Sequence, residues 1–172
     1  MVSVRSMLLS LVLAACWLPG PGHAQAPGDR QQQDISRGEH CLRQMERDPQ
    51  GAIGLANNML AQERASDTVR TMALVCLVRS QLMTGEGEAA QAAIPELLPL
   101  LDATSMPQQL RVEMRLLTAT ALQELGQVRA AGDVLYQALA ESEPYTNLHL
   151  QALVAIALHH ARGMRDPAAA EP

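Results

Sequence analysis

The chain has 172 residues, 18 acidic and 13 basic side chains, and a formal net charge of −5. Every basic residue is Arg, Phe is absent and aromatic residues make up only 2%. Ala and Leu must therefore form the core, which argues against an all-β domain and favours an all-α protein. The acidic balance argues against a nucleic-acid partner, and the absence of Lys excludes Schiff-base and P-loop chemistry.

Residues 1–24 have the pattern of an export signal. Arg5 precedes an apolar run at residues 7–18, which is too short to span a bilayer, and small residues follow near Ala24. We expect cleavage after Ala24 and a periplasmic protein.

Residues 13–16 offer an alternative to simple cleavage. Their sequence, Leu-Ala-Ala-Cys, is that of a bacterial lipobox, in which the cysteine is lipidated and becomes the new N-terminus. The protein would then be an envelope lipoprotein anchored through Cys16, which is the only case in which we expect a membrane to be a partner. In both cases we expect residues 25–33 to be a linker.

Helical patterns follow one another from about residue 34 to residue 166. Capping residues at Ser36, Asp48 and Ser66 mark helix starts, and Gly85 and Gly126 mark helix ends. Because the loops are short, neighbouring helices should be antiparallel. We expect a disordered tail at residues 167–172. The expected helices span about residues 36–47, 49–62, 67–84, 88–101, 107–125, 127–141 and 147–162.

A pattern of Gly, four residues and Ala recurs along the helical segment. It stands at Gly85–Ala90, Gly126–Ala131 and Gly163–Ala168, and Ala52 occupies the corresponding place in a first unit that lacks the Gly. The successive Ala residues are 38, 41 and 37 positions apart. A period of this length with two helices in each unit indicates an α-solenoid.

The repeated unit resembles the tetratricopeptide repeat (TPR) family over residues 34–168, although its period exceeds the usual length of about 34 residues. The resemblance implies a right-handed TPR-like α-solenoid of about three and a half helix-turn-helix repeats. It also implies that a protein or peptide is the partner. The third unit matches the family's order best, at Ala119, Leu125-Gly126, Ala131, Leu135, Ala138-Leu139 and Pro144.

In a TPR-like solenoid the first helix of each unit lines the concave surface. The Lys, Asn and Arg set with which TPR grooves clamp a C-terminal carboxylate is absent. The alternative, which is the more common case for polar surface residues, is that these candidates belong to a solvated helix face. In the repeat frame, the residues that should face this groove are Arg37, Gln44, Arg79, Leu82, Thr120, Gln123, Glu124 and His160.

The sequence contains no motif for a nucleophile, a metal site or a phosphate-binding loop, so we expect no enzyme activity, no cofactor and no metal. Adjacent His159 and His160 point to different sides of a helix and cannot share a metal ion.

Cys41 and Cys76 lie 35 residues apart, close to one repeat, and both fall midway along the first helix of a unit. They are either a disulfide or two separate buried thiols. Axes of packed helices lie about 8–10 Å apart, whereas a disulfide needs Cα atoms within about 7 Å.

Residues 147–162 are apolar nearly all round, and such a helix is normally buried. We expect a partner, a second copy in a homodimer or a missing downstream domain to cover it. The sequence thus predicts a non-enzymatic protein- or peptide-binding scaffold exported to the periplasm or envelope. The alternative is the sensory region of a truncated signal-transduction protein, such as a diguanylate cyclase.

Overall fold

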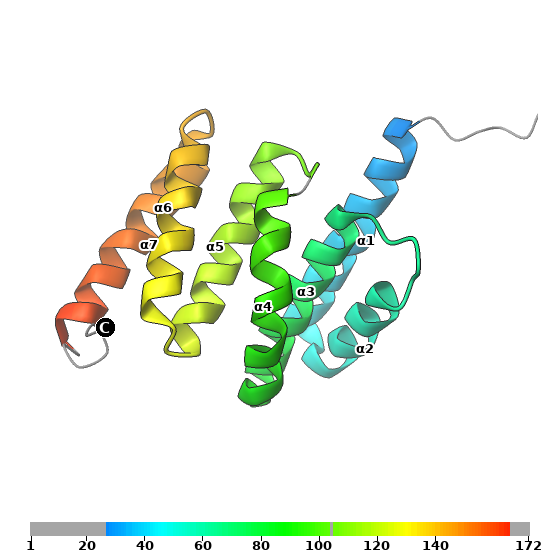
Figure 1. Cartoon of the computed structure of the whole chain (residues 1–172), viewed down its shortest axis with the longest axis horizontal. Helices are drawn as coiled ribbons and strands as arrows, with labels where there is room; N and C mark the ends of the chain where they lie inside the picture. Colours follow the sequence, from blue (N-terminus) through cyan, green and yellow to red (C-terminus); the bar gives the residue numbers. More distant parts are fainter. Residues whose placement is uncertain (1–26, 104, 166–172) are drawn as a thin grey trace, which may run out of the picture.

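A computed structural model describes residues 27–103 and 105–165, which form seven α-helices and no strand (Figure 1). The expected all-α fold is confirmed for this part of the chain. The expected export signal, Cys16 and the tail at residues 167–172 lie outside the described residues. The helices are α1 (Pro27–Arg47), α2 (Pro49–Leu60), α3 (Asp67–Met83), α4 (Gly87–Ala103), α5 (Gln108–Glu124), α6 (Val128–Ser142) and α7 (Thr146–Arg165).

The helices form two layers. The odd-numbered helices lie in a row, since α3 contacts α1 and α5, and α5 contacts α7. Each even-numbered helix packs against two members of that row: α2 on α1 and α3, α4 on α3 and α5, and α6 on α5 and α7. Figure 1 shows α4 and α6 in front of the odd-numbered row. Every turn between helices therefore carries the chain from one layer to the other.

Local capping chemistry fixes several helix ends at the expected places. Asp48 Oδ1 accepts a hydrogen bond from the Gly51 amide at 2.9 Å, which starts α2 behind Pro49. Gly85 and Gly126 have φ values of 81° and 71°, and they follow α3 and α5. Only glycine adopts this left-handed conformation without a steric penalty, so these two residues turn the chain into the next helix.

Both ends of the helical segment differ from the expectation. Helix α1 begins at Pro27 rather than at Ser36, so residues 27–33 are helical and not a linker. Long-range contacts hold this extension, because Ser66 Oγ donates to Asp34 Oδ2 at 2.6 Å and Gln31 Nε2 donates to the Ser105 carbonyl at 3.5 Å. At the other end α7 continues through Gly163 to Arg165, at a cost of about 1 kcal/mol for a helical glycine.

Helix α3 is the centre of the core. It contacts four other helices, and all residues from Thr68 to Val78 except Arg70 are buried. Some of its apolar side chains join Leu97 and Leu101 of α4, Leu122 of α5 and Leu135 of α6 in one cluster, and the others join a second cluster with α1 and α2. Leu, Ala, Val and Met thus fill the interior, as the shortage of aromatic residues requires.

A disulfide joins α1 and α3. Cys41 and Cys76 are both fully buried, and their Cα atoms are 6.1 Å apart. Gly38 lies one turn before Cys41 and rests on Met72, so no side chain of residue 38 separates the two helices there. A Cβ atom at position 38 would lie 2.7 Å from the Met72 Cβ. The glycine therefore lets α1 lie directly against α3, one turn from the bond between Cys41 and Cys76.

Replacing Gly38 with alanine is expected to destabilise the protein by about 1–3 kcal/mol, because the new methyl group overlaps Met72 and forces α1 away from α3. Helix propensity alone predicts the opposite, a gain of about 1 kcal/mol. Gly54→Ala is the matched control, since a Cβ there meets nothing within 4 Å. Urea denaturation should show a loss for the first variant and a gain for the second. A gain of equal size in both would contradict the close contact.

Candidate functional site

Three of the groove residues predicted from the sequence come together on the row of odd-numbered helices. Arg79 NH1 of α3 lies 2.8 Å from Glu124 Oε1 of α5 in a salt bridge. The neighbouring Gln123 connects α5 to α7, since its Oε1 accepts from Arg162 NH1 at 2.9 Å and its Nε2 lies 3.3 Å from His159 Nδ1. The contacts of these three residues thus connect α3, α5 and α7, which are neighbours in the odd-numbered row.

The other predicted groove residues are engaged elsewhere. Arg37 NH1 donates to Gln62 Oε1 at 3.3 Å, beyond the end of α2. Gln44 Nε2 donates to the capping Asp48 carboxylate at 3.2 Å. His160 turns toward α6, where its Nε2 lies 2.9 Å from the Tyr136 hydroxyl, and Leu82 is half-buried against the main core. The structure therefore does not gather these four residues with Arg79, Gln123 and Glu124.

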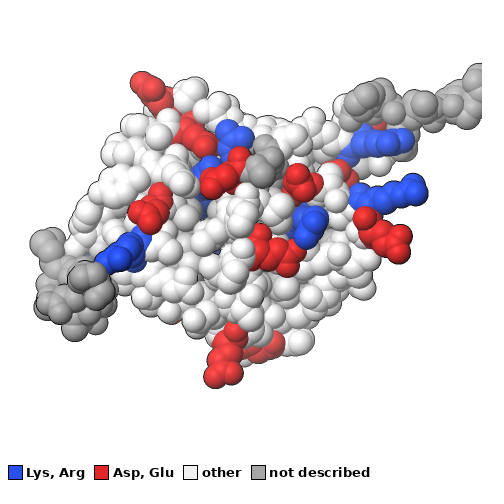
Figure 2. Space-filling view, viewed as in Figure 1, with Lys and Arg blue, Asp and Glu red and all other residues white. Residues whose placement is uncertain are grey.

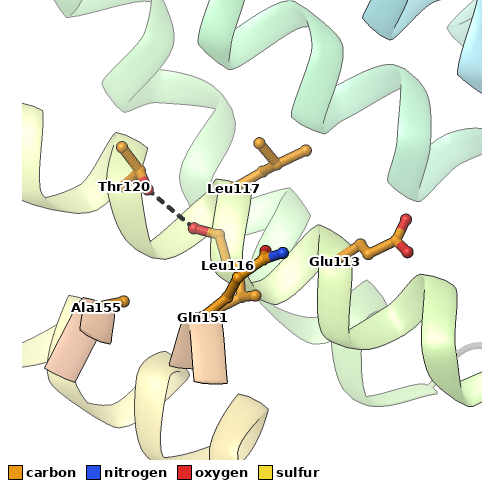
Figure 3. A pocket seen from close by; sticks show the side chains of 6 residues that line it. All are labelled: Glu113, Leu116, Leu117, Thr120, Gln151 and Ala155. Atoms are coloured by element: carbon orange, nitrogen blue, oxygen red, sulfur yellow. Dashed lines mark hydrogen bonds between the residues drawn. The ribbon is translucent and has the colours of Figure 1, made fainter. Parts of the chain in front are cut away.

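A cavity of about 410 Å³ lies between α5 and α7 (Figure 3). Leu116, Leu117 and Ala155 give it an apolar lining, and Glu113, Thr120 and Gln151 add a carboxylate, a hydroxyl and an amide. Of these six residues the groove prediction included only Thr120. Leu116 and Leu117 were missed because a leucine in an amphipathic helix is normally a core residue, and Glu113 and Gln151 were missed because the repeat frame did not place them in the groove. The cavity can hold an apolar group and hydrogen-bond its polar edge.

Helix α7 leaves a large apolar surface uncovered next to this cavity. One side of the helix is buried, through Leu148 and Ala152. The other side of the helix is apolar and exposed, and we call it the α7 stripe. It includes the exposed Ala157. Its large members are Leu150, Leu153, Val154 and Leu158, which are 55%, 43%, 58% and 54% exposed. Exposed large apolar side chains that adjoin one another are typical of interaction surfaces.

The opposite layer carries interhelical charge pairs. On the face seen in Figure 2, acidic and basic side chains are interspersed. Arg115 of α5 is only 4% exposed, and its guanidinium contacts Asp102 Oδ1 at 3.0 Å, Glu141 Oε1 at 3.1 Å and Gln137 Oε1 at 2.5 Å. These contacts connect α5 to the end of α4 and to α6, so they hold the layers together rather than present charge to a ligand.

Burial lowers the pKa of His159 below 6.5, and the nearby His160 and Arg162 lower it further. At mildly acidic pH the folded protein therefore binds fewer protons than the unfolded chain, and stability is lost as the pH falls through 6.5. We expect the melting temperature to be lower at pH 5 than at pH 7.5. His159→Gln should reduce this difference, whereas the exposed His40→Gln should leave it unchanged. An unchanged difference in His159→Gln would contradict this assignment.

Within the described residues no group of three or more His, Cys, Asp or Glu side chains is placed to hold a metal ion. None of the described helices is long and apolar enough to cross a membrane. Comparison with protein-family models, with curated proteins and with solved structures finds no match for the chain. Its function must therefore be argued from the cavity, the α7 stripe and the residues around them.

Proposed function

We propose that the protein is a non-enzymatic scaffold that binds a protein or peptide on its odd-numbered helices. The observation that carries this proposal is the cavity between α5 and α7, which opens beside the α7 stripe. Apolar side chains with a few polar groups around them are the usual lining of a site that holds a side chain of a partner. The apolar residues of the lining can bury an apolar side chain of the partner, and its polar residues can form hydrogen bonds with the partner.

The proposed architecture is a TPR-like α-solenoid. Its support is the row of odd-numbered helices, the even-numbered helices that each pack on two members of the row, and the left-handed Gly85 and Gly126 after α3 and α5. In this architecture the first helices of successive units present one continuous surface to a ligand. Arg79, Gln123 and Glu124 would then border the bound segment, while Leu116 and Leu117 would contact its apolar side chain.

We also propose that the protein is exported to the periplasm or envelope. The Cys41–Cys76 disulfide supports this location, because disulfides persist in oxidising compartments and are rare in a reducing cytosol. The signal pattern at residues 1–24 and the disulfide therefore point to the same compartment by independent arguments.

Site-specific photocrosslinking tests the binding proposal. A photoreactive amino acid at Thr120, which is exposed and lines the cavity, should give a discrete adduct in cells that express the protein naturally. The same probe at Asn57, which is exposed on α2, is the control and should give none. Leu117→Arg should abolish the Thr120 adduct while circular dichroism shows an unchanged fold. Equal labelling at Thr120 and Asn57, or an adduct that survives Leu117→Arg, would overturn the proposal.

A further inference from the structure

The spacing and exposure of the apolar residues in the α7 stripe are those of a face on which another helix can dock. Leu150, Leu153, Val154, Ala157 and Leu158 are spaced three and four residues apart, so they lie along one side of the helix. Each large member is roughly half exposed. Residues of the opposite side, Leu148 and Ala152, are already buried in the fold. The stripe is therefore additional apolar surface, separate from the face that holds α7 in place.

The preceding unit shows what covers an equivalent face. Gly126 and Gly163 are 37 residues apart, and the same interval relates Leu150, Leu153, Val154 and Ala157 to Glu113, Leu116, Leu117 and Thr120 of α5. These four α5 residues line the cavity that α5 shares with α7, and Leu116 packs in one cluster with Leu148 of α7. On α5, another α-helix, α7, packs along this face and leaves the cavity beside it. The repeat thus indicates a helix as the occupant of the α7 stripe.

The charges around the stripe indicate what kind of helix it is. Residues 146–165 include no acidic side chain in a chain whose net charge is −5. Arg162 is exposed near the C-terminal end of α7 and supplies a positive charge there, and the imidazoles of His160 and His149 lie toward the two ends of the helix as hydrogen-bonding groups. A partner helix with Asp or Glu beside its apolar residues would complement these groups.

A second copy of the chain does not supply such a helix. Another α7 carries no carboxylate to pair with Arg162. Helix α1, at the far end of the row, has exposed charged residues such as Glu39, Arg43 and Glu46, and these would meet apolar side chains if copies stacked head to tail. We therefore propose that the α7 stripe docks an amphipathic α-helix of another protein, apolar along one face and acidic on its flanks. This inference rests on the proposed scaffold function and names its partner class.

Two synthetic helical peptides test this proposal. They share the same leucine stripe, but one has Glu and the other Lys at the flanking positions, and their binding to the full chain is followed by fluorescence anisotropy. The Glu peptide should bind at least tenfold more tightly. Leu150→Gln/Val154→Gln should abolish its binding at an unchanged melting temperature, because both residues are exposed. The matched control, Asn57→Gln/Asn58→Gln on exposed positions of α2, should bind as the parent does.

Three outcomes would overturn the inference. They are equal binding of the two peptides, no binding of either, and a dimer in light scattering that dissociates in Leu150→Gln/Val154→Gln. The last outcome would identify a second copy as the occupant. A Thr120 photo-adduct that persists alongside any of them would leave the scaffold function standing, so the two proposals fail separately.

Discussion

Replacing both Cys41 and Cys76 with alanine is expected to lower the free energy of unfolding by about 4 kcal/mol. The bond closes a loop with a sequence separation of 35 residues, and its main effect is to restrict the unfolded chain. It also ties α1 to α3, the helix at the centre of the core. A loss of this size is a large part of the stability of a typical domain. Urea denaturation of the parent and the double variant measures it.

The same experiment in a reducing agent provides the control. Both cysteines are fully buried, so the bond should react only after unfolding has exposed it. At equilibrium the reductant should therefore destabilise the parent by a similar amount and leave the double variant unchanged. If the parent and the double variant had equal stability under oxidising conditions, the two residues would be separate buried thiols.

The sequence predicted helix ends best where the signal is local. Asp48, Ser66, Gly85 and Gly126 act within a few residues of their own position, and each cap or turn lies where the sequence placed it. The predicted start of α1 was wrong because the true start depends on contacts with distant residues. The bond between Asp34 and Ser66 spans 32 positions, and nothing near Ser36 reveals it.

The candidate site was only partly predictable for the same reason. Polar residues such as Arg79 and Glu124 could be assigned to the surface of the odd-numbered helices from the repeat frame. The apolar lining could not, because whether Leu116 and Leu117 face a cavity or the core depends on how closely α7 approaches α5. That separation is set by packing along the whole interface and has no signature in a single repeat.

Arg115 is the clearest case of a residue that the sequence analysis missed. No local pattern distinguishes it from the other arginines, since its partners come from α4 and α6. In the structure its guanidinium also donates to the carbonyl of Leu101 at 3.3 Å, close to the end of α4, where helical carbonyls lack partners. Arg111 Nε contacts Glu141 Oε2 at 2.7 Å, so two arginines of α5 share one carboxylate of α6.

Arg115→Ala is expected to destabilise the protein by about 3 kcal/mol, because it removes the buried partner of Glu141 and Gln137 and leaves a gap between three helices. Arg70→Ala is the matched control. The Arg70–Glu96 pair has a similar distance, 2.7 Å, but both side chains are about half exposed. Such pairs contribute about 0–1 kcal/mol, so urea denaturation should separate the two variants clearly.

A further variant separates charge from packing at this position. Arg115→Met keeps most of the side-chain volume and removes the hydrogen bonds to Asp102, Gln137 and Glu141. If the network holds α4, α5 and α6 together, the methionine variant should lose most of what the alanine variant loses. Stability equal to the parent would show that Arg115 contributes through its volume alone. In that case the packing of α4 and α6 on α5 would depend on apolar contacts, and the stability of the protein should respond little to salt.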